Sequence, residues 1–260
     1  MKNALYPKVS NRHMLQHMAQ NAKIVVFTGF PCAGRGQYLQ QCLLLARGMG
    51  KEVSLIQWKT TKDFFDKTTT QTNDQLQQCM GNWLLDTIEA WVRSHPDDKS
   101  IVMIEAPFVE GGFIELAQKQ QKMGMESLLS NEIVQFVAPV PTEKAWKELL
   151  HQHKKQTTDS SRKHLDLWKQ MCVAANAFGQ KIELEEEKVP NYTELIYVYV
   201  FTKVLKHRHL TTFPTDKLYW EKETNQNIPM ESLPMDLEVV KEYVEQAQKS
   251  IPTKTAWYLT

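Results

Sequence analysis

The chain has 260 residues, a hydrophobic fraction of 42%, a charged fraction of 23% and a net charge of +1. This length suffices for one domain with an extension, and the near-neutral charge gives no electrostatic reason to expect nucleic acid or a membrane surface as a partner. The beginning of the chain has no apolar signal-peptide segment, and the apolar runs are too short to span a membrane. Four scattered cysteines without a Cys-x-x-Cys pair indicate reduced thiols. We therefore expect a cytoplasmic protein that does not enter a membrane.

Short apolar runs predict buried β-strands at four places in the chain. They are residues 23–28, 52–56, 100–105 and 133–138. Each run has the length of a strand and is continuously hydrophobic, which is typical of strands that are covered on both faces of a sheet.

Helical periodicity characterises most of the chain between and after these strands. The predicted helices are residues 35–48, 74–93, 112–123, 142–150, 165–178, 192–207 and 237–248. Residues 60–73 are polar and rich in threonine, which predicts a loop or a frayed helix. Strands that alternate with helices predict an α/β fold, here a three-layer αβα sandwich with a mainly parallel sheet and a C-terminal extension that is helical or irregular.

The pattern divides the chain into three parts. Residues 1–22 form an N-terminal extension, residues 23–210 form the α/β domain, and residues 211–260 form a C-terminal extension that packs on the core. The carboxyl ends of parallel strands meet at one edge of the sheet, where ligands bind in such folds. We therefore expect residues 29–36, 57–61 and 105–112 to surround one crevice.

Seven tryptophans are many for a chain of this length. Four lie on apolar helix stripes and are predicted to be in the core: Trp83, Trp91, Trp146 and Trp168. Trp58 follows the second strand, where it could stack on a nucleotide base. Trp220 and Trp257 lie in the C-terminal extension beside Tyr219 and Tyr258, and these four aromatic residues either pack on the core or anchor a partner protein.

A glycine-containing loop follows the first strand and opens a helix. Its sequence over residues 29–36 is Gly-Phe-Pro-Cys-Ala-Gly-Arg-Gly, with both glycines at the spacing of the phosphate-binding motif GxxxxGK[ST]. In that motif the backbone N–H groups surround a phosphate, the lysine reaches the terminal phosphates and the hydroxyl binds Mg²⁺. Here Arg35 takes the lysine position and Gly36 takes the hydroxyl position.

The two replacements differ in their consequences for binding. Arg35 keeps the positive charge on a longer, planar group, whereas Gly36 removes the Mg²⁺ ligand. The loop therefore predicts a site for phosphate, ATP or another nucleoside triphosphate, with weak or no dependence on Mg²⁺. The candidate binding residues are Gly29, Cys32, Ala33, Gly34, Arg35, Gly36 and Gln37. The alternative is a glycine turn that binds nothing.

The segment 26–34, Val-Phe-Thr-Gly-Phe-Pro-Cys-Ala-Gly, is similar to the Gly-Phe-Pro-Gly-Ala-Gly of polynucleotide kinases. Over residues 23–178 the chain resembles P-loop kinases of the small-substrate or polynucleotide 5′-kinase type. This resemblance implies an aspartate base after the second strand, but no carboxylate occurs there before Asp63. It also implies an acidic residue near the metal at the end of the third strand. Glu105 has that position, and it is either this residue or a carboxylate paired with a neighbouring cation.

The resemblance further implies a basic lid that closes on the phosphates. The corresponding stretch is residues 151–164, with Lys154, Lys155 and Arg162 as the candidate phosphate contacts. The alternative is a solvated loop between two helices, which is the commoner role of such a run of charges.

Two functional hypotheses follow from these departures. The first is a catalytically degenerate kinase-like protein, a pseudokinase, that binds nucleotide or phosphate and acts as a binding or assembly component. The second is an active ATP-dependent phosphotransferase that acts on a small-molecule or nucleic-acid hydroxyl, with Arg35 and Glu105 as its catalytic residues. Changes at the lysine, at the metal hydroxyl and at the expected base favour the first.

Overall fold

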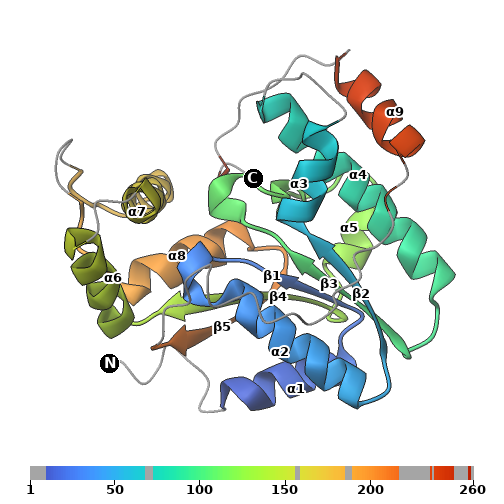
Figure 1. Cartoon of the computed structure of the whole chain (residues 1–260), viewed down its shortest axis with the longest axis horizontal. Helices are drawn as coiled ribbons and strands as arrows, with labels where there is room; N and C mark the ends of the chain where they lie inside the picture. The colour runs from blue at the N-terminus through green and yellow to red at the C-terminus, as the bar shows by residue number, and fades with distance from the viewer. Residues whose placement is uncertain are drawn as a thin grey trace.

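A computed structural model describes residues 10–67, 73–155, 159–184, 189–216, 235, 237–248 and 257–258. Within them, five parallel strands form one sheet in the order β2-β3-β1-β4-β5 (Figure 1). The strands are β1 (Ile24–Phe27), β2 (Glu52–Gln57), β3 (Ser100–Glu105), β4 (Val134–Pro141) and β5 (His209–Thr215). Helices cover both faces of the sheet, so the predicted αβα sandwich is confirmed, as are the four predicted strands.

Six of the seven predicted helices are present in the described residues, and the differences are given below. The α-helices are α1 (Asn11–Asn21), α2 (Arg35–Gly48), α3 (Trp58–Asp66), α4 (Asn73–Ser94), α5 (Met123–Leu129), α6 (Glu143–Lys155), α7 (Asp159–Ala177), α8 (Glu194–Val204) and α9 (Leu237–Gln248). Three short 3₁₀ turns lie near the carboxyl edge of the sheet or lead away from it: η2 (Pro31–Ala33), η3 (Phe108–Glu110) and η4 (Ile114–Leu116).

The strand order explains how the helices are divided between the two faces. The crossover from β1 to β2 runs in one direction along the sheet, and the later crossovers run in the other. Because parallel crossovers are right-handed, α2 covers one face together with α1, whereas α4, α5 and α8 cover the opposite face (Figure 1). Alternate residues of β1 serve the two cores: Val25 and Phe27 pack toward α1 and α2, and Ile24 and Val26 pack toward the other layer.

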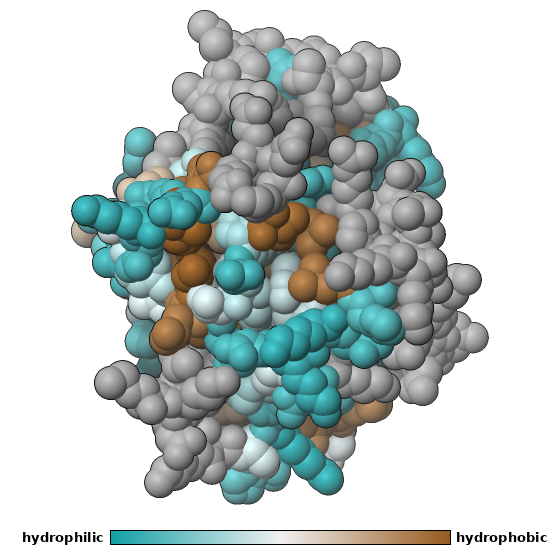
Figure 2. Space-filling view, turned by 90° about the vertical axis from the view of Figure 1, so that its left-hand side faces the viewer, coloured by the Kyte–Doolittle hydropathy of each residue, from teal (hydrophilic) through white to brown (hydrophobic). Residues whose placement is uncertain are grey.

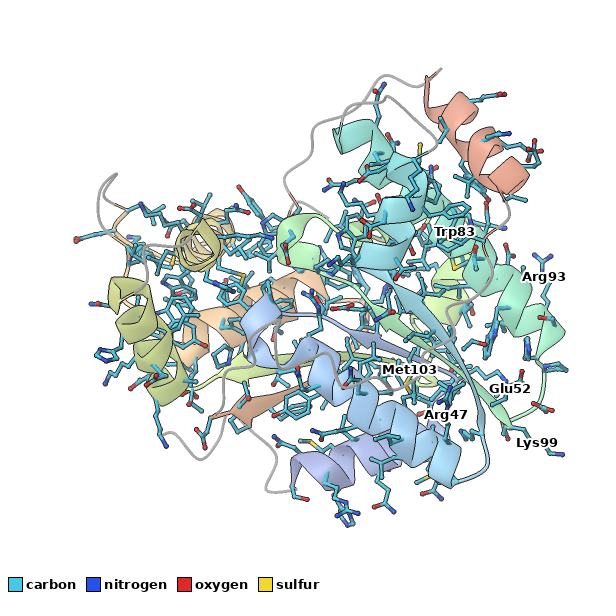
Figure 3. All side chains as sticks on the ribbon, viewed as in Figure 1. Arg47, Glu52, Trp83, Arg93, Lys99 and Met103 are labelled. Atoms are coloured by element: carbon cyan, nitrogen blue, oxygen red, sulfur yellow. The ribbon has the colours of Figure 1, made fainter. Side chains whose placement is uncertain are left out.

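The two ends of the sheet have different surroundings. Figure 3 shows Arg47, Glu52 and Lys99 at the end where β2 and β3 begin. At the opposite, carboxyl end, the connection after β1 leaves toward β2 while the connection after β3 leaves toward β4. Neighbouring strands with diverging connections form the usual ligand site of an open parallel sheet, which places the loop 29–36 at that position.

The predicted helix over residues 112–123 is wrong. The chain instead forms η3 and η4, and α5 begins only at Met123. Two residues with left-handed backbone interrupt any regular helix here, Gly111 with φ 81° and Phe113 with φ 57°. Phe113 is fully buried, and its packing holds a conformation that a residue with a side chain rarely adopts.

Three further elements were predicted only in part or not at all. Residues 58–66 form the helix α3, with Thr61 and Phe65 buried, where a loop or a frayed helix was predicted from residue 60. The N-terminal extension contains α1, which packs on α2. The strand β5 was not predicted, since its sequence contains Pro214. An edge strand tolerates a proline, and β5 lies at the edge of the sheet.

Residues of the described C-terminal part of the chain contact the core. Val240 on α9 is fully buried, and the hydroxyl of Tyr243 donates to Asp86 Oδ2 of α4 at 2.6 Å. Tyr258 lies edge-on to Phe178, with ring centroids 6.2 Å apart, and Trp257 also packs against the core. Tyr219 and Trp220 lie outside the described residues. The four tryptophans predicted to be in the core, Trp83, Trp91, Trp146 and Trp168, are all buried.

Candidate functional site

The glycine loop joins β1 to α2 through two left-handed glycines. The N–H of Thr28 donates to the Val137 carbonyl of β4 at 2.8 Å, which continues the sheet to the start of the loop. Gly29 has φ 110° and Gly34 has φ 87°. The 3₁₀ turn η2 lies between these glycines, and α2 begins at the residue after the second.

The second glycine gives the loop the backbone form of an anion-binding nest. Ala33 ends a 3₁₀ turn and Gly34 is left-handed, a succession that turns neighbouring N–H groups toward one point. The first turn of α2 adds the N–H groups of Arg35, Gly36 and Gln37, which have no acceptor within the helix. Among the described residues no side chain caps this helix. The loop therefore presents backbone donors and the positive end of a helix dipole.

A tyrosine from α8 holds the first half of the loop. The hydroxyl of Tyr197 accepts a hydrogen bond from the N–H of Phe30 at 3.0 Å, and the two rings meet edge-to-face at 5.1 Å. A Cβ atom on Gly29 would lie 2.7 Å from the same hydroxyl. Sequence reasoning missed Tyr197, because nothing in an apolar helix indicates which segment its tyrosines contact.

Arg35 turns back toward the end of the neighbouring strand β3. Its Nε lies 2.9 Å from Glu105 Oε1, and its Nη1 donates to the Gly29 carbonyl at 2.9 Å. The residue is buried, with 8% of its surface exposed. The Glu105 carboxylate therefore pairs with a neighbouring cation.

A second carboxylate extends this ion pair to α7. Glu110 Oε1 lies 3.9 Å from Arg35 Nη1, and Glu110 Oε2 lies 2.6 Å from Lys163 Nζ. We call Arg35, Glu105, Glu110 and Lys163 the loop charge cluster. Its two cations and two carboxylates neutralise one another. Sequence reasoning had singled out neither Glu110 nor Lys163, although both lie in segments that it had placed at the site, residues 105–112 and 151–164.

The residues at the loop do not fit the magnesium site of a kinase. Gly36 has no hydroxyl, and Glu105 is engaged by Arg35. Packing does not enforce the glycine, because nothing lies within 4 Å of the place where a Cβ of Gly36 would be. One buried hydroxyl adjoins the loop: Thr28 Oγ1 has no hydrogen-bond partner in the described part of the chain. Such a group commonly marks a bound water or ligand.

The other predicted site residues are placed only in part. Trp58 lies at the carboxyl edge, edge-on to Phe113 with ring centroids 4.9 Å apart. Trp58 also lies against Gly112, where an added Cβ would be 2.8 Å from its ring. With the ion pair of Arg35 and Glu105, this contact brings residues 29–36, 57–61 and 105–112 together. Lys154 and Lys155 lie in the last turn of α6 and Arg162 lies in the first turn of α7. Their side chains, like that of Cys32 in η2, lie outside the described residues.

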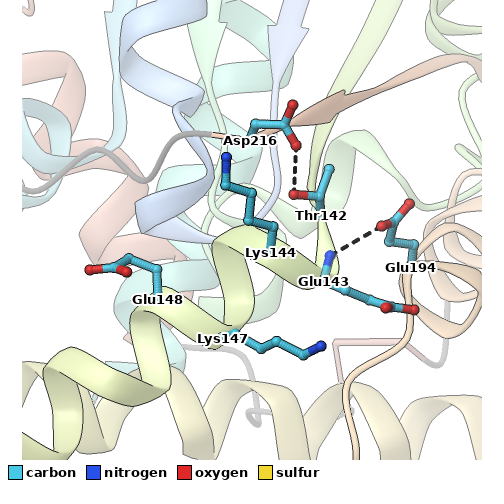
Figure 4. Close-up of a pocket in the computed structure, with 7 residues that line it drawn as sticks. All are labelled: Thr142, Glu143, Lys144, Lys147, Glu148, Glu194 and Asp216. Carbon is cyan, nitrogen blue, oxygen red and sulfur yellow. Dashed lines mark hydrogen bonds between the residues drawn. The ribbon is translucent and has the colours of Figure 1, made fainter.

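A separate open hollow of about 600 Å³ lies beyond the carboxyl ends of β4 and β5 (Figure 4). Thr142 donates to Asp216 Oδ1 at 2.8 Å and accepts from the N–H of Ala145 at 3.3 Å. The N–H of Glu143 donates to Glu194 Oε1 at 3.1 Å. These polar groups cap the start of α6 and satisfy one another, so we assign no ligand to this hollow.

Figure 2 views the molecule from the side on which α6 and α7 lie in Figure 1, and apolar residues gather there among hydrophilic ones. Elsewhere on the surface single apolar side chains are exposed, such as Met123 at 87%. Within the described ranges no helix is long and apolar enough to cross a membrane.

Comparisons with protein-family models, with curated proteins and with solved structures found no match to this chain. The site therefore has to be interpreted from its own chemistry.

Proposed function

We propose that this chain is a catalytically degenerate, P-loop kinase-like protein that binds a nucleotide or another phosphate-containing anion and acts as a binding or assembly component. The loop over residues 29–36 supports anion binding, because its left-handed Gly34 and the uncapped start of α2 provide backbone donors. This binding does not require a metal ion.

The ion pair between Arg35 and Glu105 is the main observation that argues against phosphoryl transfer. A kinase uses the cation of this loop to neutralise the charge that develops on the transferred phosphate. Here the guanidinium is held at 2.9 Å by Glu105 and at 2.9 Å by the Gly29 carbonyl. The next residue, Gly36, has no hydroxyl to bind a metal ion. Of the two groups that stabilise phosphoryl transfer, the cation is therefore held by other partners and the metal ligand is missing.

Calorimetric titration with ATP, ADP and inorganic pyrophosphate, each with and without Mg²⁺, tests the proposal. We expect binding that changes less than about twofold on adding Mg²⁺, and Arg35→Ala should weaken it about tenfold through the loss of a charge-assisted contact. Arg47→Ala is the matched control, because Arg47 lies exposed at the other end of α2. Thermal unfolding shows whether each variant remains folded. Absence of binding by the wild-type chain contradicts the proposal.

A restoring variant separates a degenerate site from an active kinase. The open space at Gly36 admits a serine side chain, so Arg35→Lys combined with Gly36→Ser rebuilds the usual motif. We expect this double variant to gain Mg²⁺-dependent ATP binding that the wild-type chain lacks. Tight Mg²⁺-dependent binding by the wild type, lost in Arg35→Ala, favours the alternative of an active ATP-dependent phosphotransferase.

A further inference from the structure

Glu110 connects the glycine loop to two helices that come from distant parts of the chain. One of its oxygens lies 3.9 Å from Arg35 and the other lies 2.6 Å from Lys163 on α7. Its backbone carbonyl also accepts from Gln77 of α4 at 3.3 Å. The carboxylate is therefore shared between a cation of the loop and a cation of α7.

An anion at the start of α2 competes with the carboxylates for the same guanidinium. Arg35 is largely buried and holds Glu105 as its close partner, with Glu110 at the longer distance. A carboxylate that faces the nest opposes a bound anion by charge repulsion, and a partly buried environment strengthens this repulsion. Lys163 lies 2.6 Å from Glu110 and offsets its charge.

We infer that Lys163 sets the anion affinity of the glycine loop by acting through Glu110, so that the position of α7 regulates the site. The inference rests on the proposed anion binding and names how that site is controlled. Lys163 is a positioning residue here. When α7 holds Lys163 against Glu110, the nest is more receptive to an anion, and when Lys163 withdraws, Glu110 moves toward Arg35 and opposes the anion. By thermodynamic linkage, a bound anion also favours the contact between Lys163 and Glu110.

A double-mutant cycle on the full chain tests this coupling, with inorganic pyrophosphate as the probe in calorimetry at low ionic strength. Lys163→Ala should weaken pyrophosphate binding about two- to fivefold, the range expected for a partly exposed ion pair. Glu110→Gln should strengthen it. In the Glu110→Gln background the Lys163→Ala change should have no further effect, since the group through which Lys163 acts is gone.

The control is Lys181→Ala, which removes one exposed positive charge beyond the other end of α7. That end is about 20 Å from Lys163 along the helix, so pyrophosphate binding should stay unchanged. If Lys163→Ala weakens binding equally in both backgrounds, the inference is overturned, because Lys163 then contacts the ligand directly. It is also overturned if Lys163→Ala has no effect in the wild-type background. If neither the wild type nor Glu110→Gln binds pyrophosphate, the proposed function and the inference both fail. If the wild type binds pyrophosphate but the effects of the two substitutions simply add, the inference alone fails and the proposed function stands.

Discussion

At the scale of single residues, the contact between Gly29 and Tyr197 decides the path of the loop. Gly29 has φ 110°, and a Cβ atom added to it would lie 2.7 Å from the hydroxyl of Tyr197. Both its backbone conformation and its surroundings therefore require a glycine. The same hydroxyl satisfies the buried N–H of Phe30 at 3.0 Å. One side chain of α8 thus fixes the position of the loop.

The substitution Tyr197→Phe should lower the free energy of unfolding by about 1–3 kcal/mol, because it removes the acceptor of a buried N–H group. Chemical denaturation measures this loss. Tyr199→Phe is the control on the same helix: its half-buried hydroxyl donates to the Phe178 carbonyl at 2.6 Å, and its removal should cost less. Gly29→Ala should be less harmful in the Tyr197→Phe background than in the wild type. An unchanged penalty contradicts the steric role of the hydroxyl.

At the scale of elements, a buried arginine fastens the start of the edge strand β5 to α5 and to the segment before α5. Arg208 directly precedes β5, and its side chain is fully buried. The guanidinium bonds to both oxygens of Glu126 on α5, at 2.9 and 3.0 Å. It also donates to the carbonyl of Leu116 at 2.8 Å and to that of Gln118. These bonds join β5 to the irregular segment that replaces the predicted helix.

Arg208→Met should destabilise the protein by about 3–5 kcal/mol, because it leaves a carboxylate and buried carbonyls without their partner. Urea denaturation gives the free energy of unfolding. Arg93→Met is the matched control, since the Arg93 side chain is 71% exposed where it pairs with Glu89, and its loss should cost less than about 1 kcal/mol. Equal effects of the two substitutions contradict a special role for the buried arginine.

The element scale also shows where prediction from sequence succeeded and failed. The helix α2 and the strands β1 to β4 follow from local periodicity and from the turn residues beside them. The segment 112–123 did not follow, because its conformation depends on Phe113 packing into the core in a left-handed conformation. The strand β5 was missed because Pro214 reads as a strand breaker until the strand is known to lie at an edge.

At the scale of the whole molecule, one buried carboxyl group links global stability to pH. Glu115 of η4 packs against Gly81 of α4, where a Cβ would overlap its carboxyl group. Although part of the side chain meets solvent, Oε2 is buried and has no partner among the described residues. Burial raises the pKa of Glu115 from 4.5 to about 7. The folded protein therefore keeps a proton that the unfolded chain releases.

Protonation of Glu115 stabilises the folded state fully below pH 4.5, and this contribution is lost as the pH rises through about 7. We expect the free energy of unfolding to fall by up to about 3 kcal/mol over this interval, measured by urea denaturation at several pH values. Glu115→Gln should remove most of the fall, whereas Glu238→Gln should not, because Glu238 is exposed. A pH profile unchanged by Glu115→Gln contradicts the assignment.

By itself, the sequence determined the α/β class, the four strands β1 to β4, the position of the glycine loop and the presence of Arg35 and Gly36 at its end. These features are local, since burial periodicity and motif spacing are readable within a dozen residues. Only the tertiary structure decided which groups meet at that loop. Arg35 meets Glu105 because β1 and β3 are neighbours in the sheet, and Tyr197 reaches Phe30 across 167 positions of the chain. Such pairings depend on strand order and helix packing, which no single segment of the sequence specifies.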